Sequence, residues 1–113
     1  MDTASLSISP TELATRLAGA GAPLVLDVRR EVRYAEADSV LPQAQRCDPD
    51  HVPGYAASQP AREVVVYCVH GLEVGKQAAA DLRAKGWNAR FLEGGIEGWK
   101  DQGFPTERKG TGA

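Results

Sequence analysis

The stretch EVVVYC, Glu63 to Cys68, decides the fold. This run of β-branched and aromatic residues has no polar alternation, which predicts a strand buried on both faces, as in a parallel sheet covered by helices. A short loop follows, and the alanine-rich segment from Val74 to Lys85 predicts a helix that ends at Gly86. A buried strand, a glycine-bearing loop and a helix together indicate a repeating unit of an α/β fold.

The sequence upstream predicts another helix and another buried strand. Ser9-Pro10-Thr11-Glu12 is typical of a helix start, with Ser9 as the cap, proline at the first position and Glu12 completing a capping box. The apolar segment PLVLDV, Pro23 to Val28, is bounded by residues that break regular structure and predicts a short strand. Residues 29–37 then predict a loop that enters a short helix.

The remaining segments are shorter. Residues 44–46 predict a brief strand, and residues 47–56 a short helix with Asp48 as its cap. ARFLE, Ala89 to Glu93, predicts the last strand. Residues 94–103 predict a glycine turn and a short helix that directs Ile96 and Trp99 inward.

Helices that alternate with short buried strands predict an α/β fold with a mostly parallel central sheet and helices on both of its faces. The chain has 113 residues, which suits one domain. We expect this single domain to span residues 1–113, with a flexible polar tail at 108–113.

Composition narrows the class of protein. Hydrophobic residues make up 42% of the chain, and 13 basic against 15 acidic residues leave a net charge of -2. This balance gives no basic surface for nucleic acid and no polybasic patch for a membrane, and no apolar run is long enough to span a bilayer. The N-terminus lacks the pattern of a signal peptide. We therefore expect a cytoplasmic protein without nucleic-acid or membrane partners.

Cysteine and histidine usage gives no sign of a metal site or a disulfide scaffold. The two cysteines, Cys47 and Cys68, are not part of a CxxC motif. The usual spacing of four zinc ligands is absent from the sequence. We expect no metal.

Cys68 stands where the predicted strand ends and the loop begins. Gly71 gives this loop the freedom to turn, so that successive backbone N–H groups can converge, and the following helix adds the positive end of its dipole. Such an environment favours a thiolate, and it would also stabilise the terminal anionic sulfur of a persulfide. The alternative is a buried core cysteine, a common residue in protein interiors.

The cysteine loop and two further stretches of the sequence together resemble a known family. Val64 to Pro105, which includes VVVYCVHGLEVGKQAAADL and LEGGIEGW, resembles the active-site half of a rhodanese, or sulfurtransferase, domain. LVLDVRREVRYAE, Leu24 to Glu36, is similar to the first strand and Asp-x-Arg turn of that family. With ISPTELATRL, Ile8 to Leu17, the resemblance spans nearly the whole chain.

The resemblance implies a rhodanese fold in which Cys68 is the catalytic residue. Cys68 would take sulfane sulfur from a small donor as a persulfide and pass it to a thiol or a cyanide-like acceptor, without a metal or an organic cofactor. The donor and acceptor would bind at the cysteine loop, formed by Val69, His70, Gly71, Leu72, Glu73 and Val74.

Asp27 and Arg29 follow the first buried strand, at the same predicted edge of the sheet as Cys68. Arg29 could contact an anionic donor, and Asp27 could brace Arg29 in a supporting role. The alternative is an ordinary ion pair at a strand end, which contributes little.

The sequence departs from the family pattern in three places. The segment VLPQAQRCDPDHV, Val40 to Val52, matches the usual Gly-His-Ile-Pro-Gly-Ala segment only at LPQA. The cysteine loop offers Leu72, Glu73 and Val74 where relatives that use thiosulfate often carry Arg, Lys, Ser or Thr, and Glu73 would repel an anionic donor. The loop is also slightly longer, a feature associated in this superfamily with phosphatase or arsenate-reductase activity.

Two alternatives to a sulfurtransferase follow. The fold could serve as a non-catalytic binding or sensor module that docks on a partner protein, with Cys68 incidental. It could also belong to an oxyanion reductase of the arsenate type, although Val74 stands where such loops end in arginine. For Cys47, a spectator role is favoured over a disulfide with Cys68 or resolution of its persulfide.

Overall fold

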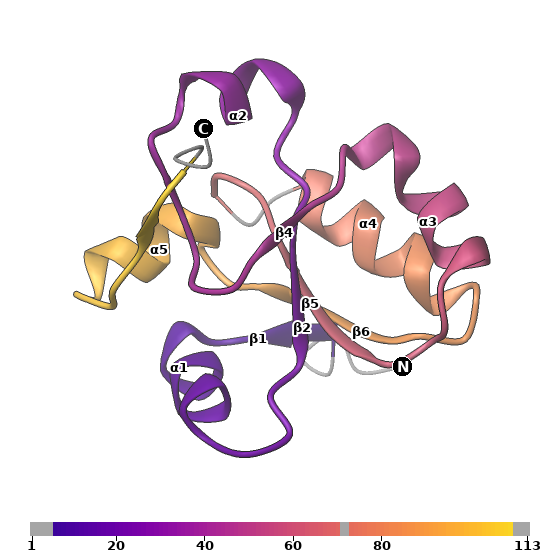
Figure 1. Cartoon of the computed structure of the whole chain (residues 1–113), viewed down its shortest axis with the longest axis horizontal. Coiled ribbons are helices and arrows are strands. Elements are labelled where there is room, and N and C mark those ends of the chain that lie inside the picture. Colours follow the sequence, from indigo (N-terminus) through magenta and orange to yellow (C-terminus); the bar gives the residue numbers. More distant parts are fainter. Residues whose placement is uncertain (1–5, 71–72, 110–113) are drawn as a thin grey trace.

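The computed structural model describes residues 6–70 and 73–109, which form a sheet between two layers of helices (Figure 1). The five-stranded sheet has the order β1-β6-β5-β2-β4, and every neighbouring pair is parallel. Its strands are β1 (Ser7–Ile8), β2 (Leu24–Asp27), β4 (Gln45–Arg46), β5 (Glu63–Tyr67) and β6 (Asn88–Leu92). The predicted α/β fold with a mostly parallel sheet is confirmed.

The helices fall into two groups around this sheet. In Figure 1, α1 (Pro10–Ala18) and α5 (Gly95–Asp101) lie on one side, and α3 (Val52–Ser58) and α4 (Glu73–Arg83) lie on the other. The short helix α2 (Glu31–Glu36) lies beyond the end of β2, and a 3-10 turn (Pro49–His51) leads into α3.

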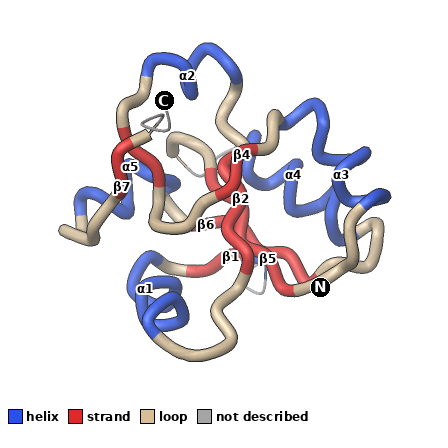
Figure 2. Tube along the Cα trace, viewed as in Figure 1, coloured by secondary structure: helices blue, strands red, loops and turns tan. Residues whose placement is uncertain are grey.

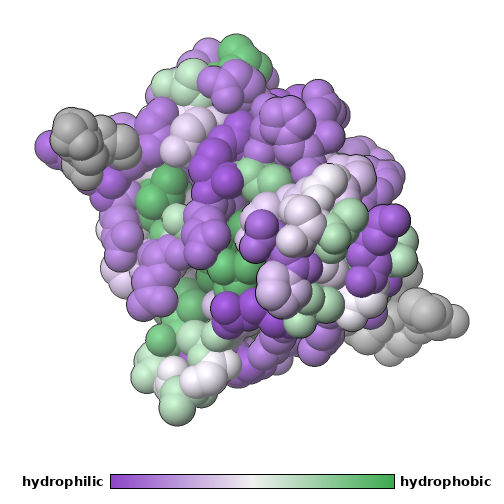
Figure 3. Space-filling model, turned by 45° about the vertical axis from the view of Figure 1, so that its right-hand side comes forward, coloured by the Kyte–Doolittle hydropathy of each residue, from purple (hydrophilic) through white to green (hydrophobic). Residues whose placement is uncertain are grey.

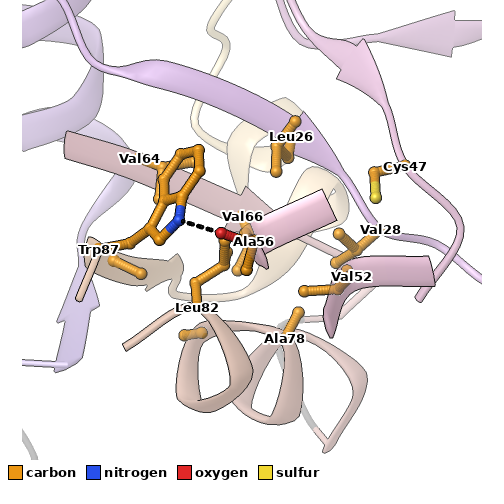
Figure 4. Packing of buried hydrophobic residues seen from close by; sticks show 12 residues of the cluster. Leu26, Val28, Cys47, Val52, Ala56, Val64, Val66, Ala78, Leu82 and Trp87 are labelled. Carbon is orange, nitrogen blue, oxygen red and sulfur yellow. Dashed lines mark hydrogen bonds between the residues drawn. The ribbon is translucent and has the colours of Figure 1, made fainter. Parts of the chain in front are cut away.

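The central strand β5 supplies both halves of the core. Val64 and Val66 pack with α3 and α4, whereas Val65 and Tyr67 pack with α1 and α5, and all four are fully buried. Figure 4 shows the α3–α4 cluster, in which the Trp87 indole donates a hydrogen bond of 3.1 Å to the Ala56 carbonyl. The uniformly apolar pattern of this strand therefore reflects burial on both faces, as predicted.

The predicted helix caps are present. The Ser9 hydroxyl accepts a hydrogen bond of 3.1 Å from the Glu12 amide, and Pro10 occupies the first position of α1. Asp48 accepts a 2.9 Å hydrogen bond from the Asp50 amide at the start of the 3-10 turn. The predicted capping box is not seen among the described residues, because the Glu12 carboxylate instead pairs with Arg90 at 3.3 Å, which ties α1 to the sheet.

The C-terminal segment differs from the predicted tail. Strand β7 (Glu107–Arg108) pairs antiparallel with β3 (Ser39–Val40), and the Lys109 ammonium donates a 2.7 Å hydrogen bond to the Tyr34 carbonyl at the end of α2. Figure 2 shows this segment running past α5 toward α2. Arg108 and Lys109, the first two residues of the predicted tail, thus have partners in β3 and α2, and residues 110–113 lie outside the described part of the chain.

The surface agrees with the balanced composition. Hydrophilic residues predominate over most of the face seen in Figure 3. Within the described residues, no helix has both the length and the apolar character needed to cross a bilayer.

Candidate functional site

The site is built at the carboxyl ends of β5 and β2. Cys68 directly follows β5, and Asp27 is the last residue of β2, paired in register with Tyr67. In parallel sheets, ligands bind outside this edge. Cys68 is 6% exposed and belongs to neither of the two core clusters formed by the described residues.

Helix α4 passes very close to the Cys68 sulfur. A Cβ added to Gly75, in the first turn of α4, would lie 3.4 Å from Sγ and 3.6 Å from the Phe91 Cβ. This contact places the first turn of α4, where the helix dipole has its positive end, beside the sulfur. Sequence reasoning missed Gly75, because only the packed structure shows what lies beside it.

A surface cavity of about 380 Å³ opens beside Cys68. It is lined by Arg29, Arg30, Arg33, Cys68, Val69, His70, Glu73 and Val74. The structure thus brings together most of the residues predicted to form the site, whereas Gly71 and Leu72 lie outside the described residues. Arg30 and Arg33 are additions from α2 that the sequence did not single out.

Asp27 and Arg29 form a buried ion pair behind this cavity. Arg29 Nη2 lies 2.6 Å from Asp27 Oδ2, and the two side chains are 3% and 1% exposed. Burial by itself would lower the pKa of Arg29, but the hydrogen bonds and charge of Asp27 outweigh it and raise that pKa above its ordinary value. The guanidinium also donates to the Ser39 carbonyl at 3.0 Å, so Arg29 is held from two sides.

Tyr67 joins the same buried network. Its hydroxyl donates a 2.9 Å hydrogen bond to Asp27 Oδ2 and accepts one of 3.2 Å from the Leu41 amide. Burial and the Asp27 charge raise the pKa of Tyr67, so the phenol stays protonated and can donate. Asp27 therefore fixes Arg29 and Tyr67 together, consistent with the predicted bracing role.

Replacing Asp27 by asparagine should strongly destabilise the protein. The substitution leaves the buried Arg29 charge uncompensated, which typically costs about 3–5 kcal/mol. The free energy of unfolding in urea at neutral pH measures this loss. The matched control is Glu36→Gln, which removes an exposed ion pair with Arg33 and should cost less than about 1 kcal/mol. A similar small cost for both variants would contradict the bracing role.

Helix α5 docks directly on the cysteine loop. The Ile96 amide donates a 2.9 Å hydrogen bond to the Cys68 carbonyl, and the Glu97 amide donates one of 3.0 Å to the Val69 carbonyl. Gly95 has a φ of 60°, and a Cβ there would lie 2.4 Å from the Cys68 carbonyl oxygen. The glycine turn predicted from the sequence thus also fixes the backbone at Cys68.

Cys47 is not brought into this site. The two cysteines lie one residue beyond Arg46 and Tyr67, which pair with Asp27 on opposite sides of β2. They are therefore two strand spacings apart, roughly 10 Å, beyond the reach of about 7 Å for a disulfide without backbone movement. A disulfide between Cys47 and Cys68 does not fit this fold.

The surroundings of Cys47 also differ from those of Cys68. Cys47 belongs to the core cluster under α3 and α4, where Figure 4 shows it beside Val28. Burial raises the pKa of the Cys47 thiol above its ordinary value, although the Arg46 charge opposes this. Cys47 is therefore held as a neutral thiol at pH 7.

Comparison with known proteins agrees with this arrangement. Residues 9–102 match the family model of the rhodanese-like domain. No curated protein sequence shows a significant match.

Several solved structures share the fold. A rhodanese-like domain protein from Staphylococcus aureus has 28% identity and a TM-score of 0.75, covering 92% of this chain and 98% of its own. A full-length protein from Lactobacillus plantarum has 29% identity and a TM-score of 0.78, with 93% and 89% covered. A protein of unknown function from Rhodopseudomonas palustris, described as a possible tyrosine phosphatase, has 23% identity and a TM-score of 0.77, with 93% and 86% covered. The chain belongs to the rhodanese-like domain family.

Proposed function

We propose that this protein is a sulfurtransferase in which Cys68 carries sulfane sulfur as a persulfide. One observation above all supports the proposal: Cys68 lies at the carboxyl end of the central strand, outside both core clusters of the described residues, and lines a cavity with three arginines. A cysteine that served only to fill the core would not need such a position.

The chemistry proceeds in two balanced half-reactions. The Cys68 thiolate attacks the sulfane sulfur of a donor such as thiosulfate, the donor's S–S bond breaks, and sulfite leaves with the electron pair. An acceptor thiolate or cyanide then attacks the terminal sulfur of the persulfide. The persulfide S–S bond breaks, Cys68 leaves as a thiolate, and the acceptor departs as a persulfide or thiocyanate.

The residues around Cys68 have separate roles in this proposal. Donor and acceptor bind at the cysteine loop, where Val69, His70, Glu73 and Val74 line the cavity, while Gly71 and Leu72 lie outside the described residues. Arg29 lines the cavity, but Asp27 and the Ser39 carbonyl occupy its Nε and Nη2 donors. We propose that Arg29 attracts an anionic donor through its charge and that Asp27 supports it.

The two other function classes are less well supported. An oxyanion reductase would need a cation at the end of the loop, where Val74 contributes an apolar wall to the cavity. A binding module with an incidental Cys68 does not explain why α4 approaches the sulfur closely at Gly75. Both remain distinguishable by experiment.

Trapping of the persulfide tests the proposal. We expect wild-type protein exposed to thiosulfate or polysulfide to gain the mass of one sulfur atom, and peptide mapping to place that sulfur on Cys68. Cyanide should remove it. A Cys47→Ala variant serves as the control and should gain the same mass. Absence of any gain would contradict a sulfurtransferase, and thiol-dependent arsenate turnover without persulfide formation would favour the reductase instead.

A further inference from the structure

We propose that the sulfur acceptor is a small thiol carrying a carboxylate, and that Arg30 and Arg33 of α2 bind this carboxylate. The inference rests on the proposed sulfurtransferase function and concerns the second half-reaction at the same cavity. It assigns acceptor recognition to α2 in addition to the cysteine loop.

The two arginines differ from Arg29 in their freedom to bind a ligand. Arg30 is exposed at the start of α2 and lines the cavity, and its side chain makes no hydrogen bond or ion pair with any residue in ranges 6–70 and 73–109, although its backbone carbonyl accepts a 2.9 Å hydrogen bond from the Tyr34 amide. Arg33 lines the same cavity, and its ion pair with Glu36 is 3.5 Å long, with both side chains about two-thirds exposed. Such exposed pairs are worth little, so a ligand carboxylate can compete for Arg33.

The charges around the cavity favour an anion. Among the residues that line the cavity, Arg29, Arg30 and Arg33 are cationic and Glu73 is anionic, whereas Asp27 and Glu36, the partners of Arg29 and Arg33, are not part of the lining. Three positive charges against one negative charge leave the lining of the cavity positive. Arginine is also well suited to a carboxylate, because its planar fork can donate two parallel hydrogen bonds.

The reaction itself creates a need for these cations. In the transfer step an acceptor thiolate must approach a persulfide that is already anionic, so like charges meet over a few ångströms. A carboxylate on the acceptor would add to this repulsion. Cations on the rim offset it and hold the acceptor by a group that does not react.

The cavity volume favours a small thiol over a protein segment. About 380 Å³ lies at the lower end of the range for small-molecule sites. Cys68 is 6% exposed, so the attacking sulfur must enter the cavity rather than meet Cys68 at the surface. A compact thiol with its carboxylate close to the sulfur fits both conditions.

Three thiols of similar size but different charge test the inference. Protein loaded with persulfide on Cys68 is mixed with 3-mercaptopropionate, 2-mercaptoethanol or cysteamine, and the rate constant for loss of sulfur is followed by intact mass. Each rate constant is expressed as the ratio of variant to wild type, because this ratio cancels the intrinsic reactivity of each thiol.

The Arg30→Gln/Arg33→Gln double variant should lose about five- to tenfold in rate with 3-mercaptopropionate. With 2-mercaptoethanol the change should stay within about twofold, and with cysteamine the rate should rise, because repulsion of its ammonium is removed. Added salt should slow wild-type transfer to 3-mercaptopropionate by screening the arginines.

Two matched variants complete the design. Glu73→Gln removes the opposing charge and should change the rates in the reverse sense, faster with the carboxylate thiol and slower with the ammonium thiol. Arg62→Gln removes an exposed arginine just before β5, at the end of the strand opposite to Cys68, and should leave all three ratios near one.

The outcomes separate the two proposals. If Cys68 gains sulfur but all three thiols respond equally to the double variant, the carboxylate inference is wrong and the sulfurtransferase function stands. If Cys68 never gains sulfur, both are wrong. The inference is supported if the double variant transfers sulfur more slowly only to 3-mercaptopropionate and Glu73→Gln transfers it faster to the same thiol.

Discussion

Replacing Cys68 by serine should reduce sulfur transfer to the background rate measured without protein. A serine hydroxyl is not ionised at neutral pH and cannot form a persulfide, so both half-reactions lose their covalent intermediate. The side chain is nearly the same size, and it lies outside the two core clusters of the described residues, so the fold should persist. The effect is therefore on chemistry rather than on stability.

Turnover of thiosulfate with cyanide or a thiol measures this loss, and urea unfolding checks the fold. We expect a decrease of at least about a thousandfold, on the scale of losing a nucleophile from a covalent mechanism. Cys47→Ala provides the comparison and should keep most of the activity, because Cys47 is roughly 10 Å away. Retention of a tenth or more of the activity by Cys68→Ser would mean that Cys68 is not the sulfur carrier.

Replacing Gly95 by alanine should both destabilise the protein and disable the site. The new Cβ would lie 2.4 Å from the Cys68 carbonyl oxygen and 2.5 Å from the Val69 carbonyl oxygen. Both obstacles are backbone atoms, so α5 must move away from the loop. The 2.9 Å and 3.0 Å hydrogen bonds from the Ile96 and Glu97 amides then weaken. The steric overlap and the strain of a left-handed φ of 60° should together lower the free energy of unfolding by about 3–5 kcal/mol.

Gly103→Ala separates steric overlap from backbone strain. Gly103 follows α5 with a φ of 83°, and a Cβ there would meet no heavy atom within 4 Å among the described residues. It should therefore cost only the strain, about 1–2 kcal/mol. At a temperature where both variants are folded, persulfide formation should fall at least about tenfold in Gly95→Ala alone. Equal behaviour of the two variants would show that α5 does not fix the cysteine loop.

The larger elements of the fold follow from the sequence because their patterns are long enough to identify. Strand β5 has an uninterrupted β-branched run. Ser9 and Pro10 predict the start of α1, because serine is a favoured N-cap and proline a favoured first helical residue. The strands β1, β3 and β7 have two residues each, too few for any periodic signal. Their pairing depends on contacts between distant parts of the chain.

In the site, too, some residues could be predicted from the sequence and others could not. Cys68 could be identified because a strand, a glycine-bearing loop and a helix are consecutive in the sequence. Arg30 and Arg33 could not, because the direction in which α2 projects its side chains depends on how that helix packs. The close approaches at Gly75 and Gly95 likewise exist only between segments that meet in three dimensions.

The pairing of β7 with β3 bears on where this domain should be cut for expression. The family match stops at residue 102, yet Pro105 accepts a 2.7 Å hydrogen bond from the Trp99 indole and Lys109 secures the end of α2. A shortened chain ending at residue 102 would keep the five strands of the parallel sheet and Cys68 but lose β7 and the Lys109 contact to the end of α2. Boundaries drawn from family matches alone would therefore remove a support of α2, the helix to which we assign acceptor binding.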